Sequence, residues 1–307
     1  MYVYGPVPSR RLGRSLGVSP IPAKTCCYDC VYCQLGHTSR MQTNRESFFK
    51  REDIFAELAA RARKVSPDYV TFIGDGEPTL CRDIGWLIEK TRRELELPVA
   101  VVTNGALLSR KDVRQDLAGA NIVIPSMDAG DETTYNKINR PHRGIDFSTM
   151  MRGQVDFSRE FSGKVWLEVM LVSGLNDSEE ELTGIRQVVD AIAPDRVYIL
   201  APIRPPAESW VRVPEPSAIF RAQQIIGEAV PVVGLENGNF GLQYFTNARD
   251  AILEIGSRHP LRREQAEYIE KYFQDTGILE ELLSEGELKE TVYADKIYLL
   301  PKHFIRV

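Results

Sequence analysis

The residues best suited to chemistry are cysteines. Four of the five lie within one short segment, between Cys26 and Cys33. Cys26, Cys30 and Cys33 have the spacing C-x3-C-x2-C, on a loop expected after the first strand. Three thiolates can hold three irons of a cubane and leave the fourth iron open to a chelating ligand. An odd cysteine count concentrated in one segment is unlike a disulfide framework and favours a metal.

Zinc is the alternative metal. His37 follows Cys33 at a spacing that would complete a Cys3His site, and Cys27 is another candidate for the fourth ligand. We expect Cys27, next to Cys26, to point away from the metal and pack in the interior. Cys81 is distant in sequence and is expected to be a buried apolar residue. The cysteines alone leave both metals open.

A second motif follows the next expected strand, Tyr69–Ile73. It is Gly74-Asp75-Gly76-Glu77-Pro78-Thr79-Leu80. Glycines let the backbone approach a ligand closely, and a carboxylate can receive an ammonium group. The position of this motif, one strand–helix unit after the cysteines, favours a binding site over an ordinary turn.

Together, the cysteine spacing, Tyr32 before Cys33, and the Gly74–Leu80 motif resemble the radical S-adenosylmethionine superfamily. The resemblance covers about residues 1–216. It implies a [4Fe–4S] cluster on Cys26, Cys30 and Cys33, which reductively cleaves S-adenosylmethionine. The products would be methionine and a 5′-deoxyadenosyl radical that abstracts hydrogen from a substrate. It also implies an electron donor such as flavodoxin or ferredoxin.

The same resemblance implies residues that bind S-adenosylmethionine. They fall at or near the ends of successive strands, where a barrel places its ligands. Each alone would more often be a helix cap or a turn, but in series they favour one shared site. The predicted residues are Gly74, Asp75, Gly76, Glu77, Thr103, Asn104, Ser126, Asp128, Glu168, Asn176 and Ile203.

A narrower likeness rests on three arginine-containing segments, Pro8–Gly17, Arg140–Arg143 and Arg204–Glu208. They resemble a group of iron–sulfur oxidoreductases of unassigned substrate, related to the tRNA wyosine-synthesis enzymes. Wyosine enzymes carry a second cluster on extra cysteines that this sequence lacks. Modification of a tRNA base is therefore kept as the alternative function.

The arginines themselves indicate an anionic substrate. Arg10, Arg11 and Arg14 precede the cysteines, and guanidinium groups bind carboxylate and phosphate in a bidentate manner. We predict that Arg140, Arg143 and Arg204 bind a small anionic molecule or a peptide. The alternative is that such arginines pair with surface carboxylates.

The elements that position these residues alternate between strand-like and helical segments. Short β-branched runs are expected at 15–21, 69–73, 99–103, 122–126, 165–172 and 197–201, and amphipathic helices at 51–64, 82–95, 109–117, 147–159 and 178–191. This order predicts an α/β fold with a parallel sheet, either doubly wound or a barrel. With the resemblance, we expect a partial (β/α)6 barrel.

The C-terminal region has a different pattern. We expect a barrel domain over 1–230 with an N-terminal arm at 1–14, a linker at 231–245, and a winged-helix-like domain over 246–307. That last region has nine Lys and Arg against twelve Asp and Glu. A DNA-reading domain is usually basic, so a metal-stabilised winged-helix regulator is the less favoured class. We expect the domain to close the barrel or to recruit a partner.

Composition bears on nucleic-acid binding, membrane insertion and export. The 307 residues carry a formal net charge of −5, which does not favour a nucleic-acid substrate. No apolar run approaches the ~18 residues that a membrane helix needs, and the first residues lack the features of an export signal. We expect a cytoplasmic protein with no membrane partner.

Overall fold

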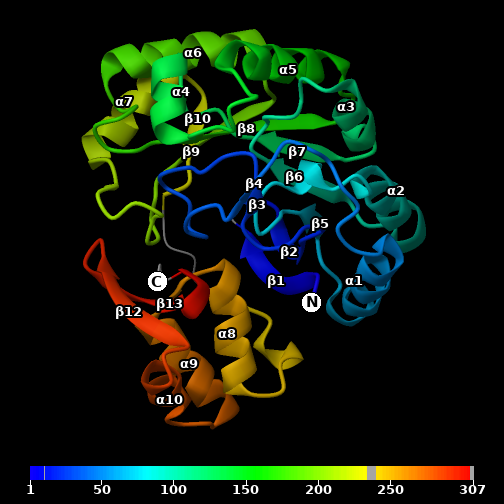
Figure 1. The fold of residues 1–307 in the computed structure, drawn as a ribbon, viewed down its shortest axis with the longest axis vertical. Helices are drawn as coiled ribbons and strands as arrows, with labels where there is room; N and C mark the ends of the chain where they lie inside the picture. Colours follow the sequence, from blue (N-terminus) through cyan, green and yellow to red (C-terminus); the bar gives the residue numbers. More distant parts are fainter. Residues whose placement is uncertain (10, 234–239, 305–307) are drawn as a thin grey trace.

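A computed structural model describes residues 1–9, 11–233 and 240–304. Within them, the main body is built on an eight-stranded, open sheet (Figure 1). Its strands, in spatial order, are β1 (Val3–Ser9), β2 (Gly13–Val18), β5 (Tyr69–Phe72), β6 (Val99–Thr103), β7 (Ile122–Pro125), β8 (Lys164–Met170), β9 (Arg196–Leu200) and β10 (Ala229–Pro231).

The strands from β2 to β10 run parallel, which confirms the expected partial barrel. The sheet is extended at both edges beyond the six expected strands. β10 adds a parallel strand beside β9, and β1 pairs antiparallel with β2, with Val3 opposite Val18. Residues 3–9, expected as part of an arm, therefore belong to the sheet. Their prolines and glycine obscure the alternation typical of a strand.

Helices cover the outer side of this sheet (Figure 1). They are α1 (Arg51–Val65), α2 (Ile84–Leu95), α3 (Lys111–Leu117), α4 (Glu132–Ile138), α5 (Phe147–Glu160), α6 (Glu179–Ile192) and α7 (Pro216–Ile226). In α6, the Ser178 hydroxyl accepts from the Glu181 N–H, and acidic residues occupy the first turn, as the dipole favours. Its apolar face, which includes Leu182 and Ile185, is buried in the barrel core.

The loop between β2 and α1 carries the cysteines. It contains two short paired strands, β3 (Thr25–Cys26) and β4 (Arg40–Met41). A single 3-10 turn, η1 (Pro78–Leu80), follows β5. Both segments leave the sheet at the carboxyl ends of parallel strands, the edge where α/β proteins bind ligands.

The C-terminal elements form a small separate core below the barrel (Figure 1). Helices α8 (Ala248–Arg258), α9 (Arg263–Phe273) and α10 (Ile278–Ser284) pack on a sheet of β11 (Leu261–Arg262), β13 (Lys296–Pro301) and β12 (Leu288–Tyr293), with 3-10 turns η2 (Leu242–Tyr244) and η3 (Lys302–Phe304). Helices followed by a hairpin match the expected winged-helix-like arrangement. Among the described residues, none of the helices is long and apolar enough to cross a membrane.

The expected linker at 231–245 falls between the end of β10 and the start of α8, and its residues 234–239 lie outside the described part of the chain. We propose that the domain boundary lies in this connection. Phe240 and Leu242 of this connection are buried in the C-terminal core. Val7 of β1 also packs against that core, so the C-terminal domain contacts the first strand of the barrel.

Candidate functional site

A cavity of about 410 Å³ lies at the carboxyl ends of the parallel strands. Its lining includes the cysteine loop, residues of β1, β2 and β8, the residues that follow β5, β6, β7 and β9, and the C-terminal half of α8. Sequence-distant segments thus meet around one cavity of the size that binds small molecules.

Cys26, Cys30 and Cys33 all line this cavity, and each is partly exposed. Cys27 is fully buried, and its Sγ lies 3.2 Å from Asn104 Nδ2, which donates to it. Cys81 is also buried and belongs to the barrel core. The expectation that Cys27 and Cys81 pack in the interior is confirmed.

Hydrogen bonds hold the cysteine loop against the barrel. The Val31 N–H donates to the Ile138 carbonyl at 2.9 Å, and the His142 N–H to the Cys27 carbonyl at 2.8 Å. The Tyr32 hydroxyl donates to Asp128 Oδ2 at 2.5 Å, and this oxygen also accepts from Asn139 at 2.7 Å. The loop is therefore fixed from both its backbone and its side chains.

His37 does not complete a Cys3His site. Its Nδ1 lies 3.1 Å from Asp29 Oδ2, and its Nε2 lies 3.8 Å from Glu208 Oε1. Across the described ranges 1–9, 11–233 and 240–304, no three His, Cys, Asp or Glu side chains are placed to share one metal ion. A cubane needs no such arrangement, because each thiolate binds a different iron.

The thiols suit a cationic cluster. Burial raises the pKa of Cys30, and the neighbouring Cys26 and Cys33 raise it further. Burial also raises the pKa of Cys33 to about 12. Three thiolates crowded together need a compensating positive charge, which a bound metal cluster supplies. The donor set, three thiols that line the cavity with Cys27 buried outside its lining, therefore fits a [4Fe–4S] cluster.

The Gly74–Glu77 turn packs directly on the cysteine loop. Gly76 bridges Thr25 in a parallel pairing, and the Glu77 N–H donates to the Thr25 carbonyl at 3.0 Å. A Cβ on Gly76 would lie 1.9 Å from the Thr25 carbonyl oxygen. Glycine is thus needed for the approach of the two loops to each other, whereas the sequence suggested an approach to a ligand.

Glu77 is buried, and protein groups occupy both of its oxygens. Oε1 accepts from the Thr79 N–H at 2.9 Å and from the Thr103 hydroxyl at 2.7 Å, and Oε2 accepts from the Asn104 N–H at 2.7 Å. Burial raises the pKa of Glu77, while these hydrogen bonds oppose the rise. The carboxylate joins the ends of β5 and β6 at the cavity wall.

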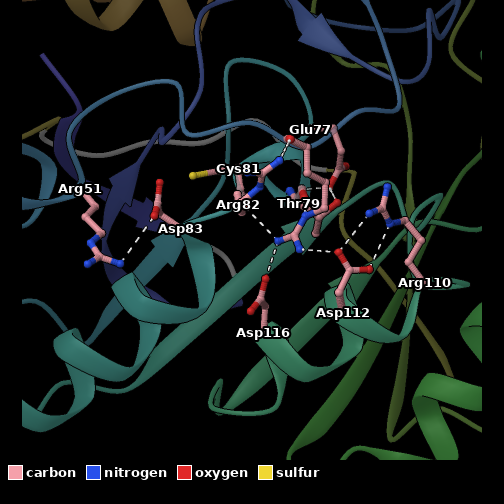
Figure 2. A network of polar contacts seen from close by, with 10 residues as sticks. Arg51, Glu77, Thr79, Cys81, Arg82, Asp83, Arg110, Asp112 and Asp116 are labelled. Carbon is pink, nitrogen blue, oxygen red and sulfur yellow. Dashed lines mark hydrogen bonds and ion pairs between the residues drawn. The ribbon is translucent and has the colours of Figure 1, made fainter.

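A buried arginine, Arg45, donates to the residues that follow this turn. Figure 2 shows the polar network of this region, with Thr79, Asp112 and Asp116 labelled. Arg45 Nε donates to the Thr79 carbonyl at 2.9 Å, and Nη2 donates to the Cys81 carbonyl at 3.0 Å. The same guanidinium pairs with Asp112 at 3.0 Å and with Asp116 at 2.5 Å on α3. Arg45 therefore connects α3 to the residues that hydrogen-bond Glu77.

We expect Arg45→Ala to lower the free energy of unfolding by about 2–3 kcal/mol, because buried carbonyls lose their donor and two carboxylates lose their partner. Arg110→Ala is the matched control. Arg110 pairs with the same Asp112 at 3.0 Å, but its side chain is 42% exposed. Its removal should cost less than about 1 kcal/mol. Urea unfolding measures both, and equal losses would contradict a specific role for Arg45.

Most predicted binding residues do meet at the cavity. In addition to the Gly74–Glu77 turn, these are Thr103, Asn104, Ser126, Glu168 and Ile203. Asp128 and Asn176 do not line it. The Asn176 side chain is fully buried and bonds the carbonyls of Asp128 and Met170 at 2.7 and 2.8 Å. Asp128 supports Tyr32 of the cysteine loop, and burial raises its pKa.

The predicted substrate arginines are not brought together. Arg204 lines the cavity, whereas Arg140 and Arg143 do not. Arg140 Nη1 donates to Glu208 Oε1 at 2.5 Å, and Arg143 is exposed. For Arg140, the alternative of pairing with a carboxylate is the one observed. Arg140 and Arg143 follow α4 rather than a strand, so they lie away from the carboxyl ends of the strands that line the cavity.

Arg11, by contrast, reaches the cavity. It forms an ion pair with Glu168 of β8, and its guanidinium lies 5.8 Å from the centre of the Tyr198 ring. Arg10 lies outside the described residues. Sequence reasoning noted Arg11 but missed Tyr4, Arg258 and His259, which also line the cavity. No local motif marks these three residues.

Comparisons with known proteins agree with this geometry. The radical SAM superfamily model matches residues 21–183. A UPF0026 protein from Methanocaldococcus jannaschii is 34% identical over 97% of this chain and 95% of its own. A radical SAM methyltransferase from Sphaerobacter thermophilus has the same fold, with a TM-score of 0.56, 18% identity, and coverage of 73% of this chain and 67% of its own. SuiB from Streptococcus suis, bound to its precursor peptide, has a TM-score of 0.53 at 15% identity, covering 73% and 49%.

Proposed function

Because the chain belongs to the radical SAM superfamily, whose enzymes use a [4Fe–4S] cluster, S-adenosylmethionine and an electron donor, we propose that Cys26, Cys30 and Cys33 hold the cluster in this protein. When bound, the cluster supplies the electron that breaks S-adenosylmethionine into methionine and a 5′-deoxyadenosyl radical, which abstracts hydrogen from a substrate. Flavodoxin or ferredoxin is the proposed donor.

One observation carries this proposal. The three cysteine thiols and the Gly74–Glu77 turn line the same cavity, and the two loops contact each other through Thr25 and Gly76. A ligand bound on the open iron would therefore lie against the turn. Thr103, Asn104, Ser126 and Glu168 surround the same space, which supports their role in binding S-adenosylmethionine.

We propose a small anionic molecule as the substrate, with a peptide segment as the other class. Arg204 lines the cavity, and its guanidinium, which also contacts Gln34 and His259, places a positive charge there that suits a carboxylate or phosphate. Ile255 of α8 and His259, which follows α8, also line the cavity, so the C-terminal domain forms part of its wall. A cavity of about 410 Å³ that also receives S-adenosylmethionine has room for a small substrate or a short peptide segment, which favours these over a folded nucleic acid.

The charges of the C-terminal domain also disfavour nucleic-acid binding. Arg263 pairs with Glu267 at 3.1 Å and also with Glu280 and Glu290, and Arg249 pairs with Glu281 at 3.0 Å. These cations are compensated within the domain, whereas a nucleic-acid surface presents them to phosphates. This supports an enzyme with a small anionic or peptide substrate over both the winged-helix regulator and the tRNA-modifying enzyme.

The test is product analysis of the reconstituted protein under anaerobic conditions. With dithionite and S-adenosylmethionine, we expect 5′-deoxyadenosine and methionine in equal amounts. Candidate anionic compounds labelled with deuterium are then added. The true substrate should speed the formation of 5′-deoxyadenosine and transfer deuterium into it. A protein with full iron content that leaves S-adenosylmethionine intact would contradict the proposal.

A further inference from the structure

Asp75, in the middle of the Gly74–Glu77 turn, is held by a residue of the C-terminal domain. Arg258, the last residue of α8, donates from Nε to Asp75 Oδ1 at 3.1 Å. The side chains of Arg258 and Asp75 are only 14% and 17% exposed. A partly buried pair of this kind fixes the orientation of both groups more strongly than a surface pair.

The Arg258 guanidinium also has an aromatic support. It lies 4.7 Å from the centre of the Tyr4 ring in β1, a cation–π distance. The Tyr4 ring in turn lies over Gly17 of β2, where a Cβ would be 2.1 Å from Cζ. Arg258 is thus placed between the first strand of the barrel and the Gly74–Glu77 turn.

The same end of α8 contacts the cysteine loop. Gln34, directly after Cys33, donates from Nε2 to the Arg258 carbonyl at 3.2 Å, and its Oε1 accepts from Arg204 Nη1 at 2.9 Å. Arg204 Nη2 lies 2.5 Å from His259 Nε2. We name these five residues, Gln34, Asp75, Arg204, Arg258 and His259, the α8 clamp.

Two tyrosines of the β12–β13 hairpin add to this interface. The Tyr298 hydroxyl donates to the Ile203 carbonyl at 2.7 Å, and the Tyr293 hydroxyl donates to the Pro202 carbonyl at 2.6 Å. The C-terminal domain therefore contacts the cysteine loop, the Gly74–Glu77 turn and the residues after β9. These are three separate walls of the cavity.

We propose that the α8 clamp completes the S-adenosylmethionine site, with Arg258 as a positioning residue that acts through Asp75. Docking of the C-terminal domain and binding of S-adenosylmethionine are then coupled, so each strengthens the other by the same factor. This inference rests on the proposed function, because it assumes that the Gly74–Glu77 turn binds S-adenosylmethionine.

The test measures S-adenosylmethionine affinity by calorimetry on the anaerobically reconstituted, unreduced protein, so that no cleavage occurs. We expect Arg258→Ala to weaken binding about tenfold with iron content unchanged, and Arg258→Lys to restore part of it. Asp75→Asn should weaken binding as well, and Asp75→Asn combined with Arg258→Ala should be no worse than the worse single variant. Arg249→Ala, at the other end of α8, should bind normally.

Hydrogen–deuterium exchange gives a second readout that does not need turnover. S-adenosylmethionine should slow exchange of the amides around residues 255–259 in the wild-type protein, and this protection should be lost in Arg258→Ala. Unchanged or tighter binding by Arg258→Ala, while the wild type binds normally, would overturn this inference alone. No binding by an iron-loaded wild type would instead overturn the proposed function.

Discussion

Alanine at Cys26, Cys30 or Cys33 is expected to abolish the iron–sulfur cluster. The wild-type protein, reconstituted anaerobically, should contain about four irons and four sulfides per chain and be brown. Each of the three thiols lines the cavity, and in the proposed site each binds one iron, so the loss of any one would leave an iron without its protein ligand. Iron and sulfide analysis, together with the visible absorption spectrum, measures the result.

Cys27→Ala and Cys81→Ala are the controls, because both thiols are buried away from the cavity. They should keep the full iron content. A colourless wild-type protein with one zinc per chain would contradict the cluster. Loss of iron in Cys27→Ala, with retention in Cys26→Ala, would mean that a different set of cysteines binds the metal.

The second large effect is expected at Gly76. In Gly76→Ala, the new Cβ would lie 1.9 Å from the Thr25 carbonyl oxygen and 2.7 Å from the Thr25 carbonyl carbon, so backbone must move. Thr25 precedes Cys26, and the shift therefore displaces the Gly74–Glu77 turn from the cysteine loop. We expect S-adenosylmethionine affinity to fall about tenfold or more, which corresponds to ~1.4 kcal/mol or more, with weaker retention of iron. Calorimetry and iron analysis measure the two effects.

Gly144→Ala is a suitable control for this change. Its Cβ would lie 3.3 Å from an atom of the partly exposed His142 ring, and the backbone at Gly144 has no positive φ. Gly144 does not line the cavity. Normal S-adenosylmethionine affinity in Gly76→Ala would show that the turn and the cysteine loop need not touch for binding.

Much of the fold follows from local sequence patterns. The β-branched run at Val99–Thr103 forms β6 as predicted, and Ser178 caps α6 with acidic residues in the first turn. β1 was missed because Pro6 and Pro8 interrupt its alternation. β10 and α4 are short, and short elements have weak periodicity.

The candidate site was predictable where residues follow strand ends. Ser126 and Thr103 were placed by that rule and do line the cavity. Asp128 follows the same rule but does not line the cavity, because protein groups take up its carboxylate: it accepts from the Tyr32 hydroxyl, the Asn139 amide and the Met170 N–H. The prediction that Arg140 and Arg143 lie at the site was wrong, because the loop after α4 is not held at the strand ends.

Contacts between distant segments carried no sequence signal. Asp75 and Arg258 are separated by 183 positions, and nothing in either segment marks the other as its partner. Likewise, the buried role of Arg45 depends on α3 lying next to the residues after Glu77. Both require the packed tertiary structure.

The most direct test of the central claim is electron paramagnetic resonance of the reduced protein with and without S-adenosylmethionine. If the cysteines and the Gly74–Glu77 turn form one site, adding S-adenosylmethionine changes the spectrum of the wild-type cluster. At a concentration of S-adenosylmethionine that half-saturates the wild type, the spectrum of any cluster in Gly76→Ala should change much less. A wild-type protein with a complete cluster whose spectrum does not respond to saturating S-adenosylmethionine would contradict the account.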